Sequence, residues 1–376
     1  MRLSVIVPVY NGLSFLPAFF DSLAAAALPE TQLILVDDGS SERVSEVFPS
    51  GSPYREVVRI RNPMNLGYSA AVNRGFEAAD GDIVIQLNTD LILHSDCLEK
   101  LVAWIDGTPN VGIVGSKLIF PTTGRVQHIG MAFGALSWCH VYFDMAADHP
   151  LCRRTRKMQI VTGATVAMSR PVLQAVGPLD ERYYNCNEDI DHCLEAVKLG
   201  YDNYTVADSV AYHWVSQSGP PRFSGIEEAD ALFWIKWSGA RQVDIGDYID
   251  EALDYVLDQR PELAGYPFAP LNLSTTRDDE IFLDRIDRRW SGALARTVHR
   301  RTHSLGKGPL LLPMLLPHRA VLEPIPYIYF VNGCADLASN RLWFENRLRT
   351  VGEEIIADST GAIFTASEFL AERIPV

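Results

Sequence analysis

Long apolar runs are missing from this chain of 376 residues. A membrane-spanning helix needs about 20 consecutive apolar residues. The longest candidates, near Ile83–Leu87 and Leu310–Leu316, are the length of a strand or are interrupted by proline. We therefore expect no membrane span, and because Met1 leads directly into an apolar strand we also expect no secretory signal.

Paired cysteines and an excess of positive charge are lacking as well. The six cysteines include no C-x-x-C pair, and a chain of this length needs no disulfide framework, so we expect reduced thiols in the cytosol. The spacing of Cys186, His192 and Cys193 fits none of the usual zinc sites. The 33 Lys and Arg against 47 Asp and Glu give a net charge of −14, which argues against a general nucleic-acid binder.

Two glycine-rich signatures of nucleotide enzymes are also absent. No G-x-G-x-x-G follows the first apolar run, which argues against a dehydrogenase on a doubly wound sheet. No glycine- and arginine-rich loop follows it either, which disfavours a sugar nucleotidyltransferase. Internal repeats and low-complexity tracts are not found in the sequence.

Apolar runs of strand length alternate with helical patterns over the first 90 residues. The expected strands are Leu3–Val9, Gln32–Val36, Val57–Ile60 and Asp82–Leu87. This alternation predicts an α/β fold with an open, mostly parallel sheet. In such sheets ligands bind outside the carboxyl ends of the strands.

Polar side chains stand where these strands end. Asp38 could accept hydrogen bonds from a base or ribose, although Asp-Gly is also a common turn pair. Asn88–Thr89–Asp90 could supply an oxygen ligand for Mg²⁺ or Mn²⁺, or could simply cap the strand. His213 could be a ligand, but a lone histidine is more often a structural hydrogen-bonding residue.

The segment Cys186–Tyr201 has acidic side chains followed by apolar residues at helical spacing. Asn185 and Asn187 can each cap the predicted helix. Glu188 and Asp189 then fall in its first turn and point about 100° apart, so that one can face a cleft while the other anchors the loop. An ordinary capped helix would show the same acidic first turn.

Seven segments then occur in order: SVIVPVYNG, LVDDGSS, NLGYSAAVNRG, GDIVIQLNTD, VTGATVAMSRPVL, LDERYYNCNEDIDHCLEAVKLGY and YHW. Over about residues 1–215 this order and spacing closely resemble the family 2 glycosyltransferases of GT-A fold. The resemblance implies an inverting transferase that uses a nucleotide-activated sugar. It also implies a Rossmann-like sheet flanked by helices, and we expect a largely helical C-terminal extension.

The resemblance assigns roles to individual residues. Asp189 matches the catalytic base and Glu188 its neighbour, with Asp191 as a rival base. Asp90 matches the metal-binding aspartate of a D-x-D motif, and His213 a histidine that often joins the metal. The expected donor-binding residues are Pro8, Tyr10, Asn11, Asp38, Asn65, Gly67, Asn73, Arg74, Asn88, Thr89 and Gly163.

Two residues depart from the family pattern. Asn88 stands at the first D-x-D position, which removes one charge from the metal site. Glu195 stands where many relatives have arginine, which puts a phosphate or acceptor contact in doubt. The chain also lacks the Q-x-x-R-W of processive membrane synthases, so we expect transfer of one or a few sugars.

The predicted organisation is a nucleotide-sugar-binding half at 1–110, an acceptor-binding half at 111–260 and an extension at 261–376. We expect a UDP- or dTDP-sugar donor, Mn²⁺ or Mg²⁺, and a glycan or lipid-linked acceptor in polysaccharide biosynthesis. The alternative is a degenerate module that binds a nucleotide-sugar or glycan without turnover.

The extension carries a local reversal of charge. Between Arg288 and Leu322 there are seven basic residues and no Asp or Glu. This pattern suggests a cytoplasmic protein that touches the inner membrane face through 288–319. A solvated basic helix beside a packed apolar segment would give the same pattern.

Overall fold

The computed structural model describes residues 2–214, 225–274, 279–290, 298–299, 312 and 325–373. The chain divides into two compact units. The first comprises Met1–Met131 and Ala147–Arg241, and the second comprises Ala132–Ala146 and Gln242–Val376. The three-part division expected from the sequence stays a prediction.

The first unit contains a ten-stranded sheet in the order β10-β12-β6-β11-β4-β1-β2-β3, with β5 paired to β12 and β7 to β6. Neighbouring strands β3, β2, β1 and β4 are parallel, whereas β11 and β10 run antiparallel to their neighbours. The mostly parallel α/β sheet predicted from the sequence is therefore confirmed. The strands are β1 (Leu3–Val9), β2 (Thr31–Asp37), β3 (Glu56–Arg61), β4 (Ile83–Leu87), β5 (Leu91–Leu93), β6 (Val111–Ile119), β7 (Val126–His128), β10 (Arg156–Met158), β11 (Thr165–Ser169) and β12 (Asp202–His213).

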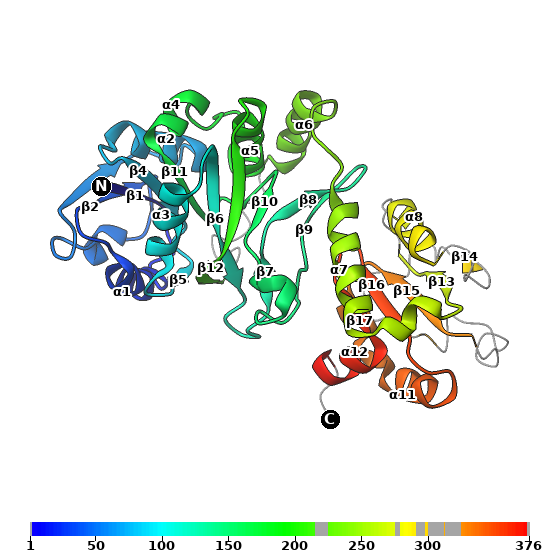
Figure 1. Ribbon diagram of the computed structural model, residues 1–376. Coiled ribbons are helices and arrows are strands. Elements are labelled where there is room, and N and C mark those ends of the chain that lie inside the picture. The colour runs from blue at the N-terminus through cyan, green and yellow to red at the C-terminus, as the bar shows by residue number, and fades with distance from the viewer. Residues whose placement is uncertain are drawn as a thin grey trace. The chain divides into compact units, whose positions relative to one another are not determined.

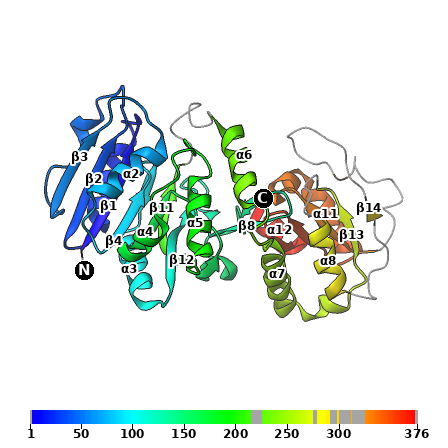
Figure 2. The ribbon, with the colours of Figure 1, turned by 90° about the horizontal axis from the view of Figure 1, so that it is seen from above.

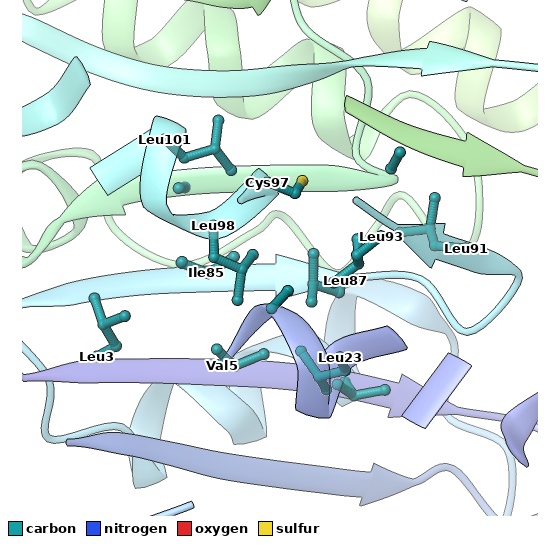
Figure 3. Packing of buried hydrophobic residues seen from close by; sticks show 14 of the residues in the cluster. Leu3, Val5, Leu23, Ile85, Leu87, Leu91, Leu93, Cys97, Leu98 and Leu101 are labelled. Atoms are coloured by element: carbon teal, nitrogen blue, oxygen red, sulfur yellow. The ribbon is translucent and has the colours of Figure 1, made fainter. Parts of the chain in front are cut away.

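Helices cover both faces of this sheet (Figures 1 and 2). The apolar run of β1 is buried on both sides, as expected for a central parallel strand. Leu3 and Val5 pack with α1 (Leu16–Ala26) and α3 (Cys97–Gly107), as Figure 3 shows. Ile6 points the other way, because side chains alternate along a strand, and meets α2 (Tyr68–Ala78) at Gly75, where a Cβ would clash with it.

The acidic segment forms a helix, as the sequence predicts. α5 spans Glu188–Lys198 and follows the short α4 (Arg170–Val176) in the sequence. It lies beside α6 (Ile226–Trp237). Asn187 occupies the N-cap position with a left-handed backbone (φ 67°). Its side chain does not cap the helix, because its Nδ2 donates instead to Asp230 Oδ1 of α6 at 2.8 Å.

The second unit has a five-stranded sheet in the order β14-β13-β15-β16-β17, together with helices. Helices are expected there, but the sheet is not anticipated from the sequence. The elements are β13 (Ala269–Asn272), β14 (Val298–His299), β15 (Tyr327–Val331), β16 (Ile355–Asp358), β17 (Ile363–Thr365), α7 (Ile245–Gln259), α8 (Asp279–Arg289), α11 (Arg341–Thr350) and α12 (Ala366–Arg373). A two-stranded sheet joins β8 (Met131–Phe133) and β9 (Trp138–His140).

Short 3₁₀ helices complete the described elements: η1 (Val44–Val47), η2 (Pro150–Arg153), η4 (Pro261–Gly265) and η5 (Cys334–Asn340). Among the helices that the structure describes, none is long and apolar enough to cross a membrane. The predicted membrane-surface segment 288–319 lies largely outside the described residues.

Candidate active site

A pocket opens in the first unit at the carboxyl ends of β1, β2 and β4. The loop before β11 and the first turn of α5 complete its wall. Its lining residues are Pro8, Val9, Tyr10, Asp38, Asn65, Tyr68, Ala71, Asn88, Thr89, Asp90, Thr162, Gly163, Ala164, Asn185, Glu188, Asp189 and His213. This is the edge of the sheet where the sequence predicts ligand binding.

Most of the residues singled out from the sequence therefore lie around one cavity. The exceptions are Asn11, Gly67, Asn73 and Arg74, which do not line it.

Three of these residues, Asn11, Asn73 and Arg74, hold neighbouring segments in place. Asn11 Oδ1 accepts from the backbone N–H groups of Ser41 and Glu42, at 2.9 and 3.2 Å. Asn73 exchanges two hydrogen bonds of 2.9 Å with the backbone of Leu179. Arg74 donates to Asn62 Oδ1. Donor contacts through these side chains stay predictions.

Asp38 organises the loop beside the pocket. Its carboxylate is buried and accepts from Asn62 Nδ2 at 2.6 Å, from Leu66 N at 2.9 Å and from Gly67 N at 3.0 Å. Gly67 has a positive φ of 96° and lies against Tyr184, where a Cβ would clash, so only glycine fits this turn. A contact between Asp38 and a base or ribose stays a prediction, although Asp38 lines the cavity.

Asp189 is fixed at the pocket by backbone groups on both sides. Gly163 N donates to Asp189 Oδ2 at 2.7 Å, and Ile190 N donates to Asp189 Oδ1 at 2.8 Å. The side chain is half-buried, whereas its neighbour Glu188 is buried. Both carboxylates line the cavity, so α5 presents two acidic groups from its first turn.

Asp191, the rival base, does not line the pocket. Its carboxylate is buried and accepts from Lys236 Nζ at 2.9 Å and from Trp237 Nε1 at 2.7 Å, both on α6. Lys236 also pairs with Glu195 Oε1 at 2.9 Å. Glu195, where many relatives have arginine, thus takes part in an ion-pair network that joins α5 to α6.

Asp90, which follows β4, lies beside His213, the last residue of β12. Asp90 Oδ1 and His213 Nε2 are 3.1 Å apart, and His213 Nδ1 is 2.8 Å from Gln127 Oε1. The glutamine oxygen and the Asp90 carboxylate both only accept hydrogen bonds, and a neutral imidazole donates from one ring nitrogen. With the histidine proton on Nδ1 toward Gln127, the Nε2 lone pair could bind a cation that Asp90 also binds. Two adjacent ligands of an octahedral ion with bonds of about 2.1 Å would be about 3.0 Å apart, so the pair fits a shared Mg²⁺ or Mn²⁺.

The protein alone would not complete such a site. Among the residues that the structure describes, no group of three or more His, Cys, Asp or Glu side chains could hold a metal ion. Asp90 and His213 would therefore share an ion with water and substrate oxygens, as Mg²⁺ commonly requires.

The pocket is strongly acidic. Asp38, Asp90, Glu188 and Asp189 line it, whereas none of its described lining residues is Lys or Arg. An anionic ligand would meet electrostatic repulsion there unless a cation accompanied it.

Tyr68 is the lining residue that the sequence analysis most clearly misses. Its hydroxyl group donates to Asn88 Oδ1 at 3.0 Å or to the Gly163 carbonyl at 3.1 Å, and it accepts from Gln86 Nε2 at 3.1 Å. Burial, and then the negative charges of Glu188 and Asp189, raise the pKa of Tyr68 well above its usual value, so the hydroxyl keeps its proton. The only sequence signal was its place in NLGYSAAVNRG, where a tyrosine in a helix is typical of the core.

Comparison with known proteins gives a family match over the N-terminal part of the chain. Residues 4–177 match the family model described as Glycosyl transferase family 2. An uncharacterized protein, y4gI, of Sinorhizobium fredii is 33% identical over 227 residues, which cover 57% of this chain and 24% of that protein.

Two further relatives have names that refer to glycan assembly. The O-antigen biosynthesis protein RfbC of Myxococcus xanthus is 27% identical over 248 residues, covering 64% of this chain and 19% of that protein. The undecaprenyl-phosphate 4-deoxy-4-formamido-L-arabinose transferase of Yersinia pestis is 37% identical over 106 residues, covering 27% of this chain and 32% of that protein. The matches span less than a third of the length of these relatives.

Proposed function

Because this chain belongs, over residues 4–177, to glycosyl transferase family 2, we propose that it transfers a sugar from a nucleoside-diphosphate donor to a hydroxyl group. One observation carries the proposal: Asp189, Asp38 and the Asp90–His213 pair line the same cavity. The proposed base Asp189, the proposed nucleotide-binding residue Asp38 and the candidate cation ligands Asp90 and His213 come from four separate elements.

Asp189 is the proposed base. An acceptor hydroxyl attacks poorly, and a carboxylate within hydrogen-bond reach removes its proton as the new C–O bond forms. The hydrogen bonds from Gly163 N and Ile190 N hold the Asp189 carboxylate in one orientation. Asp191 is the weaker candidate, because Lys236 and Trp237 already occupy its carboxylate.

We propose a single displacement with inversion at the sugar carbon. Asp189 would take the acceptor proton, and the nucleoside diphosphate would leave from the opposite side. A retaining route would instead need a nucleophilic carboxylate that forms a glycosyl-enzyme intermediate. Proton NMR of the product anomer distinguishes these outcomes, and an anomer of the donor's configuration would contradict inversion.

Asp90 and His213 are the residues that would hold a divalent ion. Such an ion, when bound, supplies positive charge for the leaving diphosphate. The acidic lining of the pocket supports this requirement, because no lysine or arginine among its described residues offsets the four carboxylates.

For the donor and the acceptor we propose chemical classes rather than single compounds. UDP- and dTDP-sugars, dTDP-rhamnose among them, suit a nucleotide end that contains Tyr10 and Asp38. The names of the relatives from Myxococcus xanthus and Yersinia pestis favour a glycan or an undecaprenyl-phosphate-linked acceptor.

The first experiment is a panel of UDP-, dTDP- and GDP-sugars with Mn²⁺, with Mg²⁺ and with a chelator. We expect one nucleotide class to be released, and chelation to abolish release. Once an acceptor is found, Asp189→Asn should lower transfer by about 10²–10⁴-fold while donor binding persists, because general base catalysis is worth that factor. Asp106→Asn, an exposed carboxylate on α3, is the control.

Three results would contradict the proposal. Unchanged transfer by Asp189→Asn would exclude Asp189 as the base. Nucleotide binding by the wild type without turnover on any donor and acceptor would favour the degenerate binding module. No nucleotide binding at all would exclude both functions.

A further inference from the structure

The Tyr68 hydroxyl group is the centre of a hydrogen-bond network beneath the pocket. It joins Gln86 on β4, Asn88 after β4 and the carbonyl of Gly163 before β11. Gln86 is buried and donates from Nε2 to both Tyr68 Oη and the Gly163 carbonyl, each at 3.1 Å. The network therefore connects the first position of the Asn88–Thr89–Asp90 turn with the loop that binds Asp189.

The orientation of Gln86 is set by its neighbours. The Gly163 carbonyl can only accept, so the amino group of Gln86 must face it. In this orientation Gln86 Oε1 is buried without a hydrogen-bond partner among the described residues. An unpartnered buried oxygen is costly, and the two hydrogen bonds that Nε2 donates offset this cost.

The same reasoning extends to Asn88. Tyr68 Oη accepts from Gln86 and can donate either to Asn88 Oδ1 at 3.0 Å or to the Gly163 carbonyl at 3.1 Å. The contact with Asn88 is the shorter one, and donation along it turns the Asn88 amide oxygen toward Tyr68. The raised pKa of Tyr68 keeps that proton in place. The amino group of Asn88 then lies on the side of the amide away from Tyr68, and Asn88 lines the pocket. The Nδ2 amino group of Asn88 makes no hydrogen bond within the described residues.

We infer that Tyr68 is a positioning residue, which holds the Asn88 amide so that its amino group donates a hydrogen bond to an oxygen atom of the nucleotide. This inference rests on the proposed function, because it requires a nucleotide in the pocket. The inference explains why asparagine, and not aspartate, can stand at the first D-x-D position. A carboxylate at this position could not donate, and it would add a fifth negative charge to a pocket with four.

The acceptor oxygen belongs either to the ribose or to the diphosphate, and both present the same chemistry to an amide N–H. Two probes separate these sources. A contact to ribose would affect the binding of uridine or thymidine and of the corresponding diphosphate equally. A contact to phosphate would affect only the diphosphate.

The test is a double-mutant cycle with the full chain. Calorimetry would measure the Kd of UDP or dTDP, whichever binds the wild type more tightly, in the presence of Mn²⁺. We expect Tyr68→Phe and Asn88→Ala each to weaken binding by about 3- to 10-fold, the worth of one hydrogen bond. If Tyr68 acts through Asn88, Tyr68→Phe should cause no further loss in the Asn88→Ala background.

A control separates positioning from a general structural role. Tyr54→Phe removes another buried phenolic hydroxyl group, which has no hydrogen-bond partner among the described residues, and it should leave the Kd unchanged. Asn88→Asp should also weaken binding, since it replaces the donor with an acceptor of the same shape.

Several outcomes would overturn the inference. These are additive losses in the double variant, an unchanged Kd for Tyr68→Phe, or tighter nucleotide binding by Asn88→Asp. Failure of the wild type to bind any nucleotide would overturn the proposed function and this inference together. The other outcomes would overturn this inference alone, because the wild type would still bind nucleotide and the proposed function would stand.

Discussion

At the scale of single residues, Gly163 sets the position of the proposed base. Its N–H group donates to Asp189 Oδ2 at 2.7 Å, and a Cβ at this position would lie 3.1 Å from Asp189 Cβ. That separation is closer than ordinary carbon–carbon contacts. A Cβ at residue 163 would therefore push Asp189 away by a few tenths of an ångström.

We predict that Gly163→Ala lowers turnover by about 3- to 10-fold, because a shift of about 1 Å at a reacting group can cost about 100-fold and relief of this contact needs a smaller one. Steady-state transfer assays would measure the loss, with circular dichroism to confirm folding. Gly107→Ala is the matched control, since a Cβ there meets no atom within 4 Å. Equal turnover in the two variants would show that Gly163 does not set the geometry of Asp189.

The sequence predicts the site unevenly at this scale. The family resemblance grouped Asp90, Asp189 and His213, and the cavity contains all three. It did not find Tyr68 or Gln127. Their roles depend on which buried polar groups meet across the fold, and spacing along one chain does not contain that information.

At the scale of secondary elements, α6 braces the helix that carries the proposed base. Lys236 donates to Asp191 and pairs with Glu195 on α5, and Trp237 Nε1 donates to Asp191 as well. Asp191 is buried, with 3% of the residue exposed. A buried carboxylate requires such partners, because its desolvation is otherwise uncompensated.

We predict that Lys236→Ala lowers the free energy of unfolding by about 1.5–3 kcal/mol, the typical worth of a hydrogen bond to a buried charged group. Urea denaturation would measure the loss. Lys100→Ala on α3, whose Nζ lies 4.0 Å from Asp96 at the surface, should change stability by less than about 0.5 kcal/mol. Similar losses of unfolding free energy in both variants would show that the contacts of Lys236 do not stabilise the packing of α5 against α6.

The secondary-structure elements differ in how well their own sequences predict them. β1 and β2 are near-continuous apolar runs, and both form where the sequence predicts strands. The sheet of the second unit escaped prediction for a physical reason. Its strands are short, and β13 (Ala269–Asn272) contains Pro270, which ordinarily counts against a strand.

At the scale of the whole molecule, the second unit is discontinuous in sequence. It includes Ala132–Ala146, which the first unit flanks on both sides. Tyr142 is fully buried, and its hydroxyl group donates to the carbonyl of Tyr248 at 3.0 Å. Tyr142 N also donates to the carbonyl of Thr360 at 3.0 Å. The segment is thus integrated into the core of the second unit.

We predict that truncation after Arg241 yields a protein that binds the dye ANS and aggregates, because Phe133, Tyr142 and Met145 lose the core that buries them. Replacing residues 132–146 in the truncated chain by a Gly/Ser segment of equal length should restore a cooperative unfolding transition. Dye fluorescence and light scattering would compare the two proteins. A monomeric, dye-negative simple truncation would contradict this prediction.

The interleaving of the two units also constrains recombination. A chain with one boundary between its units can exchange either of them through a single crossover. Here the backbone passes between the units three times, after Met131, Ala146 and Arg241. A chimaera that keeps the nucleotide pocket but takes its second unit from a relative needs three junctions, and a single crossover would leave a hybrid core in which residues 132–146 face foreign partners.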